Sequence, residues 1–272
     1  MHKEKLVIRK IKNRLNQFRR RVVPVSYSTA KKHHDVVIAR LDRIDRRFAG
    51  LEFLSEVAPT KILSLLGALK HSRSQIWQDI FVLAELDAKR NGFFVEFGAT
   101  NGIDLSNTYL LEKQYGWSGI LAEPARCWQV SLRNNRSAFI ETKCVWSKSG
   151  LTINFKEADE AEFSTIDAFA FGDQHKDRRK RSKDYSIETI SLLDMLQKYN
   201  APKVIDYLSI DTEGSEHEIL EHFDFDRYHF RLITCEHNFT ESRARIYQLL
   251  LSKGYERKFE DLSQWDDWYV GT

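Results

Sequence analysis

The chain has 272 residues, of which 42% are hydrophobic and 30% are charged. This composition is typical of a packed globule and excludes an intrinsically disordered chain. The length suffices for one sizeable α/β domain with an appendage, and it excludes two complete enzymatic domains.

The net charge of +3 conceals two regions of opposite charge. Residues 1–50 contain 15 Lys and Arg against 4 Asp and Glu, so the remainder is acidic, with a net charge of −8. A basic arm favours an anionic surface such as membrane lipid or nucleic acid as its partner. The acidic remainder argues against a polyanionic substrate.

The three cysteines and the apolar runs indicate the compartment. Cys127, Cys144 and Cys235 form no CxxC pair and no even disulfide framework, so we expect reduced thiols in the cytoplasm. The best apolar run, residues 62–69, is far shorter than the roughly 20 residues needed to span a bilayer. We therefore expect a soluble cytoplasmic protein, or one that binds peripherally at the inner membrane surface.

Residues 1–72 are predicted to form a basic helical extension. Apolar residues recur every three or four positions between residues 8 and 22, which is typical of a basic amphipathic helix. After Pro24, residues 37–51 repeat this spacing and resemble two heptads of coiled coil. Membrane binding, self-association and packing on the main domain all stay open. Nucleic acid is not expected, because the arm lacks interleaved aromatic residues.

From residue 73 to residue 272, short apolar runs alternate with helical periods, which predicts a mostly parallel sheet of about seven strands flanked by helices. The predicted strands cover residues 93–97, 118–122, 139–146, 204–210, 230–235, 255–259 and 268–270, with a short β addition at 151–155. The predicted helices cover residues 106–115, 126–134, 191–199, 215–223 and 241–253. The charged stretch 173–184 is predicted to be an exposed loop, and a mobile lid or anion-binding loop is the alternative.

The motif VEFGATNG, residues 95–102, ends a strand in Glu96 and turns through Gly98 and Gly102. Such glycines allow a ligand to approach the backbone, although any tight turn also favours them. The full G-x-G-x-x-G dinucleotide pattern is absent, and an acid before the loop suits a ligand that carries an ammonium group. Glu123, at the end of the next strand, is placed to accept two ribose hydroxyls, which fits a nicotinamide cofactor equally well.

Two further motifs bring acids to the same edge of the sheet. LSIDTEGSEHEIL, residues 208–220, delivers Asp211 and Glu213, and CEHN, residues 235–238, delivers Glu236 and His237. Buried charges there are costly unless they are paired or functional. Glu213 could instead favour a helix N-terminus, and His237 could be merely hydrogen-bonded.

Of these groups, His237 has the pKa best suited to accept a proton near neutrality. The cluster could alternatively hold a divalent metal, but no strict ligand spacing is present, so no metal is predicted.

The ordered motifs resemble the FkbM family of methyltransferases. The resemblance covers roughly 70% of the chain and runs through SQIWQDIFVL, VEFGATNG, SNTYLLE, GILAEP, SLRNNR, VWS, IDTEGSEHEIL, EHN and WDDWYVG. It implies a class I methyltransferase Rossmann-like fold and S-adenosylmethionine as methyl donor. Members often modify sugar hydroxyls of glycans or natural products, so we expect a small-molecule or glycan hydroxyl as acceptor.

The resemblance also assigns residues. Around the methionine end of S-adenosylmethionine it places Glu96, Gly98, Ala99, Asn101 and Gly102. It places Glu123 and Pro124 around the ribose, and Val145, Trp146 and Ser147 beside the adenine. It gives Asn107 the role of an anchor of the loop. We expect His237 or Asp211 to take the hydroxyl proton, with Glu236 and Glu213 orienting the base or the acceptor.

Two other classes of function compete with this reading. A nicotinamide-dependent oxidoreductase is opposed by the missing third glycine and by the absence of a Tyr-x-x-x-Lys pair. A non-catalytic module that recruits a partner through its N-terminal helices would be expected to have lost the acids of the cleft, which this chain retains.

Overall fold

The computed structural model describes residues 27–161, 164–167 and 181–272. The chain divides into two compact units, residues 1–48 and 49–272, each of which is described by itself. The amphipathic helix predicted over residues 8–22 lies outside the described residues. The predicted boundary between residues 72 and 73 stays a prediction.

In the first unit, the described residues belong to α2 (Tyr27–Glu56), which contains the whole segment predicted as two heptads. Val36, Val37, Ile38 and Phe48 are exposed apolar side chains on this helix. In the described ranges, none of the helices is both long and apolar enough to cross a bilayer.

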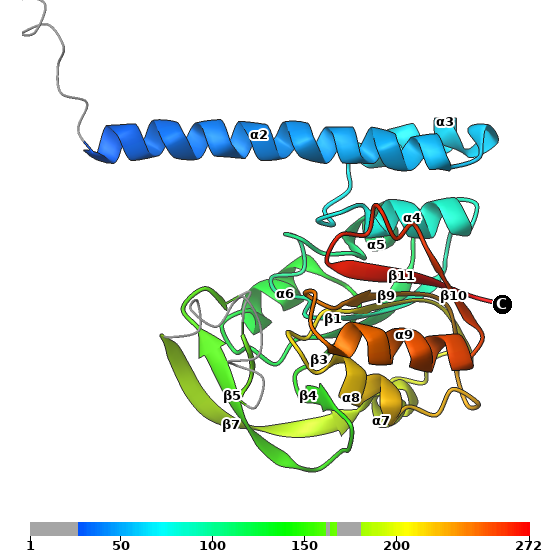
Figure 1. Ribbon diagram of the computed structural model, residues 1–272. Helices are drawn as coiled ribbons and strands as arrows, with labels where there is room; N and C mark the ends of the chain where they lie inside the picture. Colours follow the sequence, from blue (N-terminus) through cyan, green and yellow to red (C-terminus); the bar gives the residue numbers. More distant parts are fainter. Residues whose placement is uncertain (1–26, 162–163, 168–180) are drawn as a thin grey trace, which may run out of the picture. The chain divides into compact units, whose positions relative to one another are not determined.

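The second unit is a three-layer α/β structure around a seven-stranded sheet (Figure 1). Its strands are β1 (Phe93–Phe97), β2 (Ser118–Ala122), β3 (Phe139–Glu141), β8 (Val204–Ile210), β9 (His229–Glu236), β10 (Tyr255–Lys258) and β11 (Asp266–Gly271). The helices are α3 (Pro59–Leu69), α4 (Gln78–Glu85), α5 (Tyr109–Tyr115), α6 (Gln129–Asn135), α7 (Leu192–Lys198), α8 (Glu216–Glu221) and α9 (Ser242–Ser252).

The strand order is β10-β11-β9-β8-β1-β2-β3, and β11 runs antiparallel to both of its neighbours. The chain therefore winds outward from β1 on one side through β2 to β3, and on the other through β8 to β9. This order, with one antiparallel strand inserted near an edge, is that of class I methyltransferases, and it confirms the predicted fold class and the seven strands.

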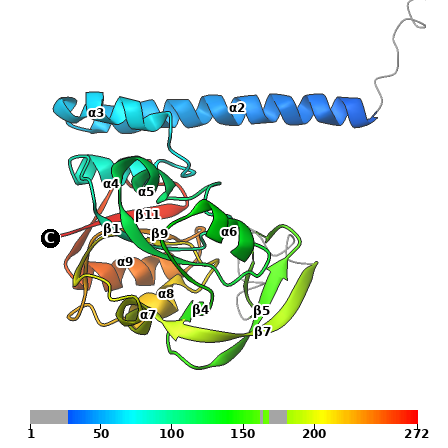
Figure 2. The same ribbon diagram turned by 180° about the vertical axis from the view of Figure 1, so that it is seen from behind.

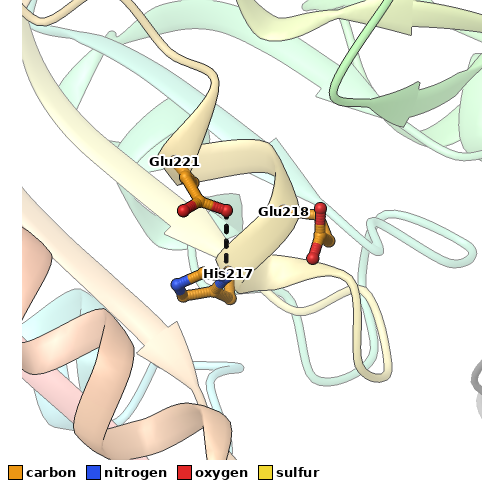
Figure 3. A group of neighbouring side chains, drawn as sticks. All are labelled: His217, Glu218 and Glu221. Carbon is orange, nitrogen blue, oxygen red and sulfur yellow. Dashed lines mark ion pairs between the residues drawn. The ribbon is translucent and has the colours of Figure 1, made fainter.

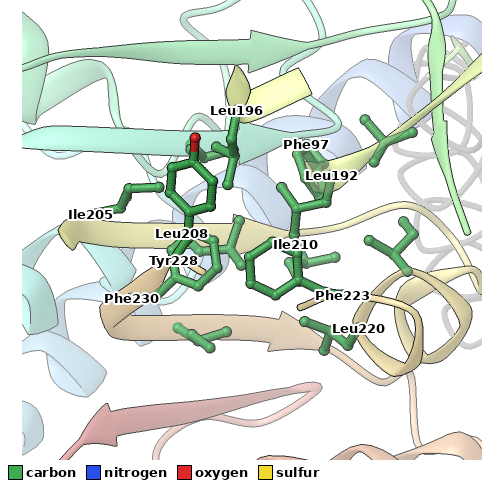
Figure 4. Packing of buried hydrophobic residues seen from close by; sticks show 14 of the residues in the cluster. Phe97, Leu192, Leu196, Ile205, Leu208, Ile210, Leu220, Phe223, Tyr228 and Phe230 are labelled. Atoms are coloured by element: carbon green, nitrogen blue, oxygen red, sulfur yellow. The ribbon is translucent and has the colours of Figure 1, made fainter. Parts of the chain in front are cut away.

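Alternation along the strands produces the two apolar layers, because successive side chains point to opposite faces of a sheet. Phe94 and Trp268 face the layer with α3, α4, α5 and α6, whereas Val95 and Tyr269 face α7, α8 and α9. Figure 4 shows part of the second layer, in which residues of the strands pack against Leu192, Leu220 and their neighbours. Both faces are buried, which explains why the central strands have nearly continuous apolar sequences.

A second, four-stranded sheet has the order β4-β7-β5-β6. Its strands are β4 (Cys144–Trp146), β5 (Thr152–Ala158), β6 (Thr165–Ile166) and β7 (Ser182–Ser191). β5 and β7 form a long antiparallel ribbon that extends from the central sheet on the side of α6 in both views (Figures 1 and 2).

One predicted strand and the end of one predicted loop differ from the structure. The strand predicted over 139–146 is wrong as a single element, because β3 lies in the central sheet and β4 in the second sheet. The Glu141 carboxylate accepts hydrogen bonds from the N–H groups of Thr142 and Lys143, which turns the chain between them. The end of the loop predicted over 173–184 is also wrong, since Ser182 already begins β7; residues 173–180 lie outside the described residues.

Candidate functional site

A cavity of about 580 Å³ opens at the carboxyl ends of β1, β2, β8 and β9. This is the edge at which ligands bind in open parallel sheets. Nine of the predicted site residues line it: Glu96, Gly98, Asn107, Glu123, Pro124, Val145, Asp211, Glu213 and Glu236. Six do not: Ala99, Asn101, Gly102, Trp146, Ser147 and His237.

The glycines of VEFGATNG are required first by contacts within the chain. Gly98 has a φ of +72°, and a Cβ placed there would lie 2.2 Å from the carbonyl oxygen of Asp211. Gly102 has a φ of +80°, and a Cβ there would lie 2.6 Å from Cγ of Arg136. Close packing of β1 on β8 and of the loop on α6 therefore demands glycine at both positions. Of the two, only Gly98 also lines the cavity.

Glu96 is buried and its carboxylate holds the start of α5. Oε1 accepts the N–H of Asn107 at 2.6 Å, and Oε2 accepts the hydroxyls of Ser106 at 3.0 Å and of Thr108. The Arg136 guanidinium lies 3.7 Å away and also donates to Ser106, Thr108 and the carbonyl of Gly102. These bonds explain why α5 begins at Tyr109 rather than at the predicted residue 106, and they leave Glu96 as a support of the loop.

Asn107 has one side-chain atom that hydrogen-bonds within the protein and one acceptor oxygen without a partner among the described residues. Its Nδ2 donates to Oγ of Ser209 at 2.9 Å, but its Oδ1 is buried and has no hydrogen-bond partner among the described residues. Because burying an unpaired carbonyl costs free energy, a ligand donor in the cavity is the natural partner for this oxygen.

Glu123 ends β2 and is anchored by backbone groups. Its two carboxylate oxygens accept the N–H groups of Thr100 and Ala125, each at 2.8 Å. Burial nevertheless raises the pKa of Glu123 to about 7. Each oxygen has a second lone pair, so the carboxylate can still accept hydrogen bonds from a ligand.

Asp211 and Glu236 form a close acidic pair at the ends of β8 and β9. Together with Glu213, they place carboxylate oxygens within 4.8 Å of one another. Burial raises the pKa of Asp211 to about 6, whereas burial and the neighbouring Asp211 raise that of Glu236 well above its ordinary value. Near neutral pH, Glu236 thus keeps a proton that it can share with the ionised Asp211.

His237 does not reach the cavity. Its Nδ1 accepts the N–H of Phe239 at 3.0 Å, and its Nε2 lies 3.7 Å from Oδ1 of Asp267. Burial lowers its pKa, which keeps the ring neutral. The predicted role of His237 as a base is therefore not supported by its position, and Asp211 is the better placed of the two predicted bases.

Asn101 has a local role in the turn. Its Oδ1 accepts the N–H groups of Ile103 and Asp104, so it shapes the loop after β1. Glu216, by contrast, caps the turn before α8, since its Oε1 accepts the N–H groups of Thr212 and Gly214.

The sequence did not indicate several residues of the cavity. Part of one wall comes from the second sheet and its connections, which contribute Phe155, Glu160, Ala161, Ser164 and Ile166. Another part comes from segments far apart in the chain, which contribute Gln75, Leu105, Asn238 and Trp265. Thr165 of β6 connects the second sheet to the acidic residues after β8, because its hydroxyl donates to the carbonyl of Glu213 at 2.9 Å.

The described lining combines apolar and acidic side chains. It contains six carboxylates, those of Glu96, Glu123, Glu160, Asp211, Glu213 and Glu236, and no Lys, Arg or His. Such a cavity favours a ligand that bears positive charge, and it disfavours pyrophosphate.

Within the part of the chain that the structure describes, two groups of side chains have the spacing of a cation site. Asp211, Glu213 and Glu236 form one in the cavity; His217, Glu218 and Glu221 form the other on α8 (Figure 3). In the second group, His217 Nδ1 lies 3.6 Å from Glu221 one helical turn away, and Glu221 is exposed. Such an i,i+4 pair is an ordinary feature of a helix surface.

Fold and cavity together define a class I methyltransferase. The family model described as "Methyltransferase FkbM domain" matches residues 96–257, which is more than half of the 272 residues. The chain belongs to the FkbM methyltransferase family.

Comparison with curated proteins gave no match. Among solved structures, the precorrin-6y C5,15-methyltransferase of Geobacter metallireducens is 11% identical, with a TM-score of 0.37, over 66% of this chain and 71% of that chain. A protein of Pyrococcus horikoshii provisionally named an RNA methyltransferase is 9% identical, with a TM-score of 0.37, over 79% of this chain and 100% of that chain. Similarities at this level carry no argument about substrate.

We predict that Gly98→Ala destabilises the protein by about 3 kcal/mol, because a Cβ at positive φ also meets the Asp211 carbonyl. Urea denaturation followed by circular dichroism measures the change. Gly67→Ala is the matched control: Gly67 lies in α3 with nothing within 4 Å of its added Cβ, so it should be neutral or stabilising by up to about 1 kcal/mol. Equal denaturation midpoints for the two variants would contradict the close contact.

Proposed function

We propose that the protein transfers a methyl group from S-adenosylmethionine to a hydroxyl group of a sugar, in a glycan, a lipid-linked saccharide or a natural product. The observation that carries the proposal is the cavity at the carboxyl edge of β1, β2, β8 and β9, lined by six carboxylates and, among the described residues, by no basic side chain. S-adenosylmethionine carries a sulfonium and an ammonium group, so it is complementary to such a lining.

The residues present fit this cofactor in three places. The unpartnered Oδ1 of Asn107 can accept a hydrogen bond from the ammonium group. Glu123, fixed by two backbone donors, can accept the ribose hydroxyls beside Pro124. For the adenine, Val145, Cys144 and Phe155 offer buried apolar surface.

This assignment changes two roles derived from the resemblance. Glu96 stabilises the loop after β1 through its hydrogen bond from the N–H of Asn107. The methionine end of the cofactor contacts Gly98 and Asn107 instead. Trp146 and Ser147 lie outside the lining, so the adenine side rests on Val145 and its neighbours rather than on the whole VWS segment.

When bound, S-adenosylmethionine supplies an activated methyl group on its sulfonium. The chain must then hold the acceptor hydroxyl in line and remove its proton, and orientation alone can contribute about 7 kcal/mol or more. Asp211, with a pKa of about 6, is ionised at neutral pH and can accept that proton. Glu236 stays protonated and donates to Asp211, while Glu213, on the turn fixed by Thr165, orients the acceptor.

The two alternatives receive less support from the cavity. A nicotinamide dinucleotide would bring a pyrophosphate into a lining that holds the ionised Asp211 and, among the described residues, no basic side chain. A module without catalysis would not need Asp211 and Glu236 as a close buried acidic pair, which is costly to fold.

We predict that titration calorimetry detects micromolar binding of S-adenosylmethionine and no binding of NADH. Glu123→Ala should weaken S-adenosylmethionine at least about tenfold, because hydrogen bonds to a charged acceptor are lost. Glu256→Ala, which removes an exposed carboxylate on β10, is the control and should leave the affinity unchanged. Binding of NADH alone would overturn the methyltransferase proposal, and binding of neither would favour the recruitment module.

The raised pKa of Glu123 gives the binding a pH dependence. Below about pH 7 the carboxyl is protonated and accepts fewer hydrogen bonds, so the affinity for S-adenosylmethionine should rise about tenfold between pH 6 and pH 8. Calorimetry at both pH values, with circular dichroism to verify the fold, measures this. In Glu123→Gln the rise should disappear; an unchanged slope in that variant would assign the titration to another group.

We further propose that residues 1–50, with their net charge of +11, bind anionic lipid at the cytoplasmic membrane surface, where each basic residue contributes about 1 kcal/mol. Vesicles containing phosphatidylserine should sediment the full chain and not a chain that lacks residues 1–50. Equal sedimentation would reject the proposal, and concentration-dependent dimerisation without lipid would favour self-association through α2.

A further inference from the structure

Three motifs of the chain have no part in holding the cofactor: SQIWQ at residues 74–78, EHN at 236–238 and WDDWYVG at 265–271. Each of them nevertheless sends one uncharged side chain to the cavity, namely Gln75, Asn238 and Trp265. We propose that these three side chains form the acceptor subsite, and that it binds a single uncharged sugar ring. The proposal rests on the proposed function and adds to it the place and the chemistry of acceptor binding.

Hydrogen bonds between distant parts of the chain assemble this wall. Nε2 of Gln78 donates to Oδ2 of Asp266 at 2.8 Å, across 188 positions of sequence. The carbonyl of Trp265 accepts the N–H groups of His237 at 2.8 Å and of Asn238 at 3.2 Å. These hydrogen bonds fix the backbone at Asn238 and Trp265, and they tie the segment of Gln75 to the segment of Trp265.

A further contact fixes the Gln75 side of the wall to the loop that follows β1. Ser74 forms an isolated parallel bridge with Leu105, and its hydroxyl donates to Oδ1 of Asp79 at 2.6 Å. Leu105 is itself 45% exposed and lines the cavity. The wall therefore adjoins the loop after β1, which also faces the proposed cofactor site. A molecule bound against the wall would lie beside the cofactor.

The side chains of this wall have unused hydrogen-bonding capacity. Within the described residues, no hydrogen bond joins the amide of Gln75, the amide of Asn238 or the indole N–H of Trp265 to the protein. All three are partly exposed. Two amides supply both donors and acceptors, which is what neighbouring hydroxyls of a sugar require. The indole adds a rigid apolar surface with a polar edge, which suits the C–H face of a ring.

The charge around the wall selects against anionic acceptors. Glu236 lies two positions before Asn238 and pairs in register with Asp266, so the acidic pair adjoins the subsite. A uronic acid or a phosphorylated sugar would meet the ionised Asp211 of this pair with like charge. An uncharged ring meets no such penalty, and it can present one hydroxyl to Asp211.

Saturation-transfer NMR tests the subsite directly. The probes are the methyl glycosides of glucose, galactose, mannose and rhamnose, with methyl glucuronide and methyl glucosaminide for comparison, added to the full chain with S-adenosylhomocysteine in place of the methyl donor. At least one neutral glycoside should give saturation transfer, and the uronic acid should give none. Calorimetry of S-adenosylhomocysteine on the same samples tests the cofactor site separately.

Trp265→Leu and Gln75→Leu should each reduce the affinity of the neutral glycoside at least tenfold and leave that of S-adenosylhomocysteine within twofold. Gln197→Leu, at an exposed position of α7, is the matched control and should change neither. Gln75→Leu keeps the test valid if Trp265→Leu fails to fold.

The remaining outcomes count against one proposal or the other. If S-adenosylhomocysteine does not bind the unmodified chain, the proposed function fails. If it binds, the subsite alone is overturned by any of three results: no neutral glycoside binds, both variants keep full glycoside affinity, or the uronic acid binds as well as the neutral ring.

Discussion

The site depends on one buried cation, the guanidinium of Arg136 at the end of α6. It pairs with Glu112 at 2.8 Å, lies 3.7 Å from Glu96 and donates to the loop between β1 and α5. Removing one partner of a buried pair typically costs about 3–5 kcal/mol, because the other charge is left uncompensated. Arg136 therefore fixes the loop whose Asn107 and Gly98 face the cavity, while its own charge stays on the far side of that loop.

This placement divides the acids into two groups. Glu96 and Glu112 face Arg136, and the pKa of Glu112 is lowered although its burial acts in the opposite direction. Among the described residues, no cation pairs with Glu123, Asp211 or Glu236, and burial raises the pKa of each. The same edge of the sheet thus has one group of acids that is paired with Arg136 and holds the loop. A second group without a paired cation among the described residues faces the cavity. A positively charged ligand gains most from the second group.

Sequence periodicity could predict the central strands but not the walls of the cavity. The ranges 93–97, 118–122 and 204–210 match β1, β2 and β8 because continuous apolar runs mark strands buried on both faces. The break after Glu141 depends on hydrogen bonds that leave no hydrophobic signal. Likewise, Gln75 and Trp265 reach one cavity from opposite ends of the chain, beside the hydrogen bond of Gln78 to Asp266, and no local pattern predicts this.

The alternation of side chains along a strand bears on the prediction of His237 as a base. Side chains of consecutive extended residues point in opposite directions, so His237, directly after β9, points away from the side of Glu236. Glu236 lines the cavity and His237 is directed toward Asp267, and the chain then turns at Asn238, whose φ is +45° and which lines the cavity again. A residue type suited to proton transfer is thus weaker evidence than the side of the strand on which it lies. That turn places Asn238, an uncharged amide, two positions after Glu236, so the proposed acceptor subsite adjoins the acidic pair of Asp211 and Glu236.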